Sequence, residues 1–192
     1  MRRFFDALLG RSQPAPSKIE RLFAIATAQV ALESQLNLRP EAQAGICFRP
    51  VESNYFDQVA SELEDLLRIS TRDTGTQYEI RTDEFRFRWV LLTDPEFEDL
   101  VATIHIVSQT LVEHQFGEQL LAAVFRFTAA NGQAVYWLYS YKRGAFYPFV
   151  PQSAAERRRD NAMELRLSSA MSGELPIEPE LERWYPMWGI PF

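Results

Sequence analysis

The sequence predicts an α+β fold: an antiparallel sheet built from hairpins, with helices packed on one face as a two-layer sandwich. Three observations carry this prediction. Two stretches have hairpin signals, amphipathic helices lie between and around them, and each strand shows one apolar face. Hydrophobic residues make up 46% of the 192-residue chain, enough to build a core between the two layers.

The chain begins with a segment that is set apart from the rest. One face of a short predicted helix carries four large apolar side chains: Phe4, Phe5, Leu8 and Leu9. Gly10 ends the helix and a linker with two prolines follows, so residues 1–16 are predicted to precede a single domain over 17–192. A helix this short is marginal in water, so we expect it to dock on its own domain, a partner or a lipid surface.

A helix and a strand are predicted to open the domain. Ser17 and Glu20 have the spacing of a capping box at the start of the helix. Residues 27–38 fit either a continuation of this helix or a strand, and the pattern leaves both open. The apolar run over 42–51 is predicted as a strand that ends at Pro50.

The clearest helix follows, with Ser53 as its N-cap and Gly75 at its exit. The next stretch, 76–94, predicts a hairpin with its turn at three polar residues: Thr82, Asp83 and Glu84. In the second strand of this hairpin, alternation places four apolar side chains on one face: Phe85, Phe87, Trp89 and Leu91.

A second strong helix is predicted over 94–117, with Asp94 as N-cap and Pro95 at its first position. A second hairpin follows it. Its turn is Asn131–Gly132, and an Asn-Gly pair between apolar runs is a strong short-range hairpin signal.

The last part of the chain predicts a helix and a tail. Ser153 and Glu156 again have capping-box spacing, which predicts a helix over 153–173. The proline- and aromatic-rich tail, 174–192, is expected to pack across the domain as an extended arm with one short turn of helix.

Composition excludes several classes of protein. The formal charge of −6 argues against a broad electrostatic grip on nucleic acid. Cys47 is the single cysteine, so no disulfide forms within the chain, and its apolar surroundings predict a buried side chain. No stretch approaches the roughly 20 apolar residues of a membrane-spanning helix. We therefore expect a soluble cytoplasmic protein.

Residues suited to catalysis or metal binding form no motif. His105 and His114 stand about two and a half turns apart on one predicted helix, so they face roughly opposite sides. Neither belongs to a zinc-binding H-E-x-x-H pattern, and the chain has no G-x-S-x-G elbow or phosphate-binding glycine loop. We expect no catalytic residue, no metal site and no cofactor, and hence no enzyme.

A basic and aromatic corner over 141–151 has two interpretations: a structural bend of the chain, or a binding loop for an anionic group. Its candidate contact residues are Lys142, Arg143, Phe146 and Tyr147. Prolines and a glycine stiffen and bend the segment, which suits either role. The arginines at 157–159 could extend the patch, but a solvated helix face that pairs with nearby carboxylates is favoured.

Six stretches along the chain resemble the PspA-associated protein PspAB family: FFDALLGR, AGICFRPVES, DPEFEDLVATIHIVSQTL, YKRGAFYPF, RRDNAMELRL and RWYPMWGIPF. They follow the family's order over nearly the whole chain. The resemblance implies association with phage shock protein A, a coiled-coil membrane-remodelling protein of the envelope-stress response. It supplies no catalytic residue.

The leading hypothesis is a non-catalytic accessory protein that acts with phage shock protein A by protein–protein interaction, at the cytoplasmic face of the membrane. Its contacts would be the first helix and the basic-aromatic corner. The alternative is a small-molecule-binding protein or an uncharacterised enzyme with a pocket between sheet and helices. The polar groups of this pocket would come from Tyr147, His105 and the arginines. A third hypothesis is peripheral contact of the first helix with anionic lipid, because Arg2, Arg3 and Arg11 flank its apolar face.

Overall fold

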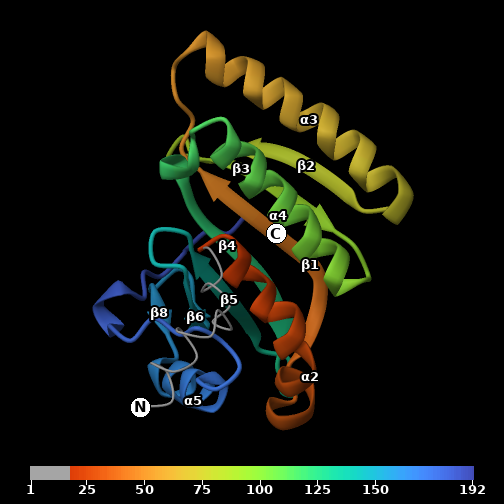
Figure 1. Cartoon of the computed structure of the whole chain (residues 1–192). Coiled ribbons are helices and arrows are strands. Elements are labelled where there is room, and N and C mark those ends of the chain that lie inside the picture. Colours follow the sequence, from red (N-terminus) through yellow and green to blue (C-terminus); the bar gives the residue numbers. More distant parts are fainter. Residues whose placement is uncertain (1–17) are drawn as a thin grey trace, which may run out of the picture.

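A six-stranded antiparallel sheet forms the centre of the computed structural model, which describes residues 18–192 (Figure 1). The strands are β1 Arg39–Phe48, β2 Gln77–Thr82, β3 Arg88–Thr93, β4 Leu120–Thr128, β5 Ala134–Ser140 and β6 Ala145–Phe149. They lie in the order β2-β3-β1-β4-β5-β6, and every neighbouring pair is antiparallel. A small ribbon follows, made of β7 Pro151–Ser153 and β8 Arg158–Arg159.

The helices pack on one face of this sheet, which we call the helix face. The α-helices of the described chain are α2 Ala24–Leu36, α3 Asn54–Thr74, α4 Phe97–Glu113 and α5 Asn161–Met171. Short 3-10 turns are η1 Glu20–Phe23, η2 Gly117–Gln119 and η3 Leu181–Arg183. Figure 1 shows α2 and α4 lying across the sheet, with α3 beside β2. The predicted α+β class, with helices on one face of an antiparallel sheet, is confirmed.

The strands divide their apolar side chains between two cores, because successive residues of a strand point to opposite faces. In β1, Ile46 and Phe48 join the large core under the helices, whereas Cys47 joins a second core on the opposite face. In β3, Val90 enters the large core and Trp89 enters the second one. Both faces of the sheet are therefore apolar and covered.

The chain's last residues cover the second face, which we call the tail face. The segment leaves α5 and first pairs with the sheet edge, where Phe146 N donates to Pro176 O at 2.7 Å and Glu178 N donates to Phe146 O at 2.9 Å. After η3 it packs its apolar side chains on the second core: Trp184, Met187, Trp188, Ile190 and Phe192. Gly45 gives room for this cover, since a Cβ there would lie 3.2 Å from the Phe192 ring.

Local turn and capping signals account for several elements. Both predicted hairpins are present as β2–β3 and β4–β5, but Phe85 and Phe87 belong to the turn that Asp83 holds and not to the strand, which begins at Arg88. In the second hairpin, Gly132 has a φ of 83°, which glycine adopts without steric cost. The Ser53 side chain accepts a hydrogen bond from Phe56 N at 3.1 Å, which confirms it as the N-cap of α3, and Gly75 ends that helix with a φ of 82°.

The open question over 27–38 is resolved in favour of helix. The helix α2 continues to Leu36, and Asn37 then takes the left-handed conformation, with a φ of 52° and a ψ of 37°. Asparagine tolerates this region better than most residues do, so it ends the helix without glycine. The predicted cap at Ser17 and the predicted helix and linker over 1–16 lie outside the described residues.

The predicted helix over 153–173 is wrong in its first part. Glu156 N does donate to Ser153 Oγ, at 3.2 Å, but this bond closes the turn between β7 and β8. The helix begins only at Asn161, where Asp160 caps it by accepting from Met163 N at 2.9 Å. At both Ser153 and Asp160, the side chain accepts a hydrogen bond from the backbone N–H three residues later. Because β7 pairs with β8, the first of these bonds closes a turn, and a helix follows only the second.

The N-cap predicted at Asp94 is also displaced. The helix α4 begins at Phe97, with Glu96 in the capping position. Asp94 is buried just before it, where its carboxylate accepts from Glu96 N at 2.8 Å and from Thr76 Oγ1 at 2.5 Å. Asp94 therefore ties the start of α4 to the start of β2.

No helix between residues 18 and 192 combines the length and the apolar character needed to cross a bilayer.

The aromatic packing of the helix-face core leads to a stability prediction. Phe125 is fully buried in β4, with its ring centroid 5.7 Å from that of Phe97 in α4. Phe125→Ala should lower the free energy of unfolding by about 3–5 kcal/mol, because it removes apolar contacts and leaves a cavity. Urea denaturation followed by circular dichroism measures the change.

Phe85→Ala is the matched control, because the Phe85 side chain is 62% exposed in the β2–β3 turn. It should change the free energy of unfolding by no more than about 0.5 kcal/mol. Equal losses for the two variants would contradict the assignment of Phe125 to the core.

Candidate functional site

A hollow of about 520 Å³ opens on the tail face of the sheet. Its floor comes from three neighbouring strands, through Trp89 of β3, Cys47 of β1 and Leu121 of β4. The β2–β3 turn forms one wall and the end of the tail forms another, through Met187 and Trp188. We call this space the tail-face hollow.

The β2–β3 turn is shaped by a single carboxylate. Asp83 Oδ1 accepts from Phe85 N and Phe87 N, both at 2.9 Å, and Asp83 Oδ2 accepts from Trp89 Nε1 at 2.9 Å. Arg86 completes the turn with a φ of 67°. These bonds fix the backbone so that the Phe85 and Phe87 rings line the hollow.

The opposite wall is held by hydrogen bonds from the sheet. Arg81 Nη1 donates to Pro191 O at 3.2 Å, and Tyr147 Oη donates to Tyr185 O at 3.1 Å. Phe192 stacks on Tyr136, with the ring centroids 6.3 Å apart. An extended segment does not satisfy its own backbone groups, so these bonds set the position of the tail.

Cys47 lies at the floor of the hollow but is only 2% exposed. Burial, and to a smaller extent the negative charge of Asp83, together raise the pKa of its thiol to about 12. The thiol is therefore protonated at neutral pH, as expected of a buried small hydrophobe and not of a nucleophile.

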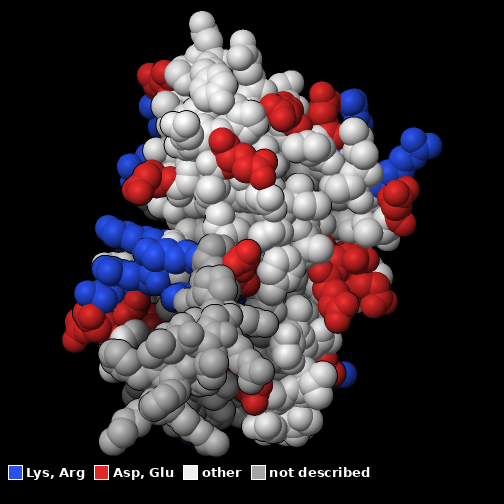
Figure 2. Space-filling model, in the orientation of Figure 1, with Lys and Arg blue, Asp and Glu red and all other residues white. Residues whose placement is uncertain are grey.

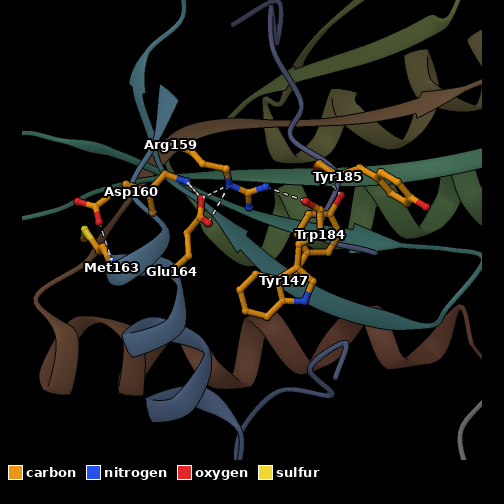
Figure 3. Close-up of polar contacts among 8 residues, drawn as sticks. Tyr147, Arg159, Asp160, Met163, Glu164, Trp184 and Tyr185 are labelled. Atoms are coloured by element: carbon orange, nitrogen blue, oxygen red, sulfur yellow. Dashed lines mark hydrogen bonds and ion pairs between the residues drawn. The ribbon is translucent and has the colours of Figure 1, made fainter. Parts of the chain in front are cut away.

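A buried ion pair lies between α5 and the tail (Figure 3). Arg159 Nε donates to both carboxylate oxygens of Glu164 at 2.8 Å, and Arg159 Nη1 donates to Trp184 O at 2.7 Å. Val150 N donates to Glu164 Oε1, also at 2.8 Å. The Glu164 side chain is 2% exposed and that of Arg159 17%. Through these bonds, the pair of Arg159 in β8 and Glu164 in α5 is joined to Val150, the residue after β6, and to Trp184 in the tail.

Opposing effects act on the Glu164 carboxyl. Burial raises its pKa, and the hydrogen bonds from Arg159 and Val150 oppose this rise. A smaller hollow of about 260 Å³ lies beside the pair, with Leu165 and Leu181 at its rim. The hydrogen bonds of the pair join separate segments of the domain.

The three arginines at 157–159 do not lie on a helix, so the predicted helix face is wrong, whereas the predicted pairing with nearby carboxylates is confirmed for Arg158 and Arg159. Arg158 pairs with Glu156 at 2.6 Å in the β7–β8 ribbon, with both side chains exposed, whereas Arg159 is engaged with the buried Glu164. Arg157 has a φ of 49° and lines the tail-face hollow. Figure 2 shows a group of basic side chains on the side where β8 lies in Figure 1, with acidic side chains beside it.

The basic-aromatic corner is the turn between β5 and β6. Lys142 and Arg143 are exposed in this turn, and Gly144 closes it with a φ of 66°. Phe146 and Tyr147 follow in β6 and are buried on opposite faces of the sheet. Their rings are therefore used in the domain's own packing, and the two charged residues form the accessible part of the corner.

The start of the described chain lies against this same turn. Lys18 Nζ donates to Lys142 O at 2.9 Å, and Tyr139 Oη donates to Lys18 O. The other predicted contact residues, Phe4, Phe5, Leu8 and Leu9, lie outside the described residues.

The polar groups suggested for a pocket between sheet and helices are not brought together. Tyr147 is buried on the tail face, whereas His105 belongs to α4 on the helix face, where it packs on Phe23 at 4.6 Å between ring centroids. His114 is separate again: its Nδ1 lies 2.9 Å from Tyr55 Oη and its Nε2 lies 3.3 Å from Glu62. Residues 18–192 contain no group of three or more His, Cys, Asp or Glu placed to hold a metal ion.

The fold and these features define an α+β domain with one antiparallel sheet, a helix layer and a tail that closes the other face. The chain belongs to the PspAB family, described as PspA associated protein B, whose model matches residues 2–192. Neither a curated protein nor a solved structure matches the chain. The family's name links its members to PspA.

The state of Cys47 leads to a labelling prediction. With a pKa of about 12, about one thiol in ten thousand is ionised at pH 8, and the side chain is also shielded. A thiol reagent such as Ellman's reagent should therefore react with native protein far more slowly than with protein unfolded in urea. Rapid stoichiometric labelling of the folded protein at pH 8 would contradict this account of the site.

The buried ion pair leads to a second prediction at this site. Glu164→Ala should lower the free energy of unfolding by about 3–5 kcal/mol, because it leaves the Arg159 guanidinium without its counter-charge in a largely buried place. Glu156→Ala breaks the neighbouring exposed pair with Arg158 and should cost no more than about 1 kcal/mol. A double-mutant cycle in urea denaturation measures both couplings. Similar couplings for the two pairs would show that burial does not distinguish them.

Proposed function

We propose that the protein is a non-catalytic accessory partner of phage shock protein A in the envelope-stress response, acting by direct contact at the cytoplasmic face of the membrane. The observation that carries this proposal is the match of the PspA associated protein B family over residues 2–192.

A role without catalysis is supported by the state of the residues best suited to chemistry. Cys47 is buried and protonated, and His105 and His114 lie in separate surroundings on α4 and at its end. Among residues 18–192, neither histidine contacts a nucleophile and an orienting carboxylate in a cavity. The ion pair of Arg159 and Glu164 is engaged within the fold.

The proposed contact surface is the β5–β6 turn together with residues 1–16 at the start of the chain. Lys142 and Arg143 are exposed in the turn, and Lys18, the first described residue, donates a hydrogen bond to Lys142 O. A basic turn beside an apolar segment fits a partner surface that carries acidic side chains around an apolar strip. The two sequence features predicted as separate contacts therefore form one continuous site in the proposal.

A pull-down with purified phage shock protein A tests the proposal. Deletion of residues 1–16 and the double substitution Lys142→Glu with Arg143→Glu should each weaken retention by about tenfold or more, the first through lost apolar contact and the second through like-charge repulsion. The effect of the charge reversal should shrink as salt is raised. Retention is measured by quantitative immunoblot.

Arg72→Glu is the matched control, because Arg72 is exposed on α3, away from this turn. It should leave retention unchanged. Absence of retention with the unmodified chain would overturn direct contact, and retention unaffected by both changes would remove the proposed surface.

A further inference from the structure

Four aromatic rings line the tail-face hollow: Phe85, Phe87, Trp89 and Trp188. The face of an aromatic ring is negative and attracts organic cations, most strongly where water is partly excluded. The hollow measures about 520 Å³, within the ~300–1,000 Å³ range of small-molecule sites. Its size and lining therefore suit a compact ligand with a substituted ammonium group.

Two carboxylates lie among these rings. Asp83 lines the hollow and is held in place by three N–H donors, two on Oδ1 and one on Oδ2. The charge of Asp83 reaches the floor, since it contributes to the raised pKa of Cys47. Glu84 is exposed at the rim and forms no ion pair with another residue of the described chain.

One cation lines the same hollow. Arg157 comes from the turn between β7 and β8. This ribbon follows β6, the edge strand on the opposite side of the sheet from β2. Its neighbours Arg158 and Arg159 are paired with Glu156 and Glu164, whereas Arg157 forms no ion pair within residues 18–192. A guanidinium suits a phosphate or a carboxylate, to which it can donate two hydrogen bonds.

We propose that the tail-face hollow binds a small zwitterion. Its ammonium group lies against the aromatic rings beside Asp83 and Glu84, and its anionic group, a phosphate or a carboxylate, pairs with Arg157. The negative charges belong to the β2–β3 turn and the positive charge to the β7–β8 turn. A purely cationic ligand would therefore be repelled by Arg157, and a purely anionic one by Asp83 and Glu84. This inference does not depend on the association with phage shock protein A.

Titration of the full chain with phosphocholine tests the site, with choline and inorganic phosphate as the two half-ligands. Binding is followed by calorimetry and by tryptophan fluorescence, to which Trp89 and Trp188 contribute. Phosphocholine should bind about tenfold more tightly than either half-ligand, since it meets both walls. Equal affinity for phosphocholine and choline, or no binding of any of the three up to ~10 mM, would overturn the proposal.

Three substitutions at exposed or turn positions separate binding from folding. Glu84→Gln, Arg157→Gln and Phe85→Ala should each weaken phosphocholine binding by about threefold to tenfold. Their matched controls are Glu52→Gln, Arg72→Gln and Ile69→Ala, at exposed positions away from the hollow, and these should leave it unchanged. Denaturation in urea confirms that each variant is folded. Binding unaffected by all three hollow variants would place the ligand elsewhere.

Vesicles distinguish the two sources of such a ligand. Binding to phosphatidylcholine vesicles that free phosphocholine competes away would identify a lipid headgroup as the ligand. Binding of free phosphocholine without binding of vesicles would identify a soluble zwitterion. Both results support the site, and they differ in whether the hollow can be reached from a membrane surface.

Discussion

Strands β1 and β6 each bury five consecutive residues, and this requires cover on both faces of the sheet. In β1 the last five residues are all buried, as are all five residues of β6. Because neighbouring side chains of a strand point to opposite faces, helices on one side cannot bury them all. The second cover is a segment with no helix longer than one turn, so its position depends on contacts with the sheet and not on its own structure.

The contacts that hold this cover are polar groups placed at the edge of an apolar core. Arg159 reaches Trp184 O while it pairs with Glu164, and Tyr147 and Arg81 bond two further carbonyls of the tail. A buried ion pair gains little net stability over an apolar pair, but breaking it is costly. Such groups therefore fix one arrangement of the tail, and the tail-face hollow is the part of the sheet that this arrangement leaves open.

Local chemistry made the fold class and most elements predictable. Asn131–Gly132 and Ser53 act within a few residues, and alternation assigns a face to each strand residue. The same kind of signal misled the prediction at Ser153. Its bond to Glu156 N is present but closes a turn, since a capping bond does not require that a helix follow.

The hollow was not predictable, because its walls come from turns and a tail far apart in sequence. Phe146 and Tyr147 appeared as surface candidates because their neighbours are charged, yet strand geometry buries both.

The register of the sheet relates the two proposed surfaces. Arg88 lies opposite Phe48, which pairs with Leu120, and Ala122 pairs with Ser140. The β2–β3 turn and the β5–β6 turn therefore lie at the same end of the sheet. They are four strand spacings apart, about 19 Å before twist. An interface that buries about 800 Å² of one partner is roughly 30 Å across, so a single partner surface at this end can cover the basic turn and reach the mouth of the hollow. The two proposed surfaces therefore belong to one end of the sheet, although their residues lie far apart in the sequence.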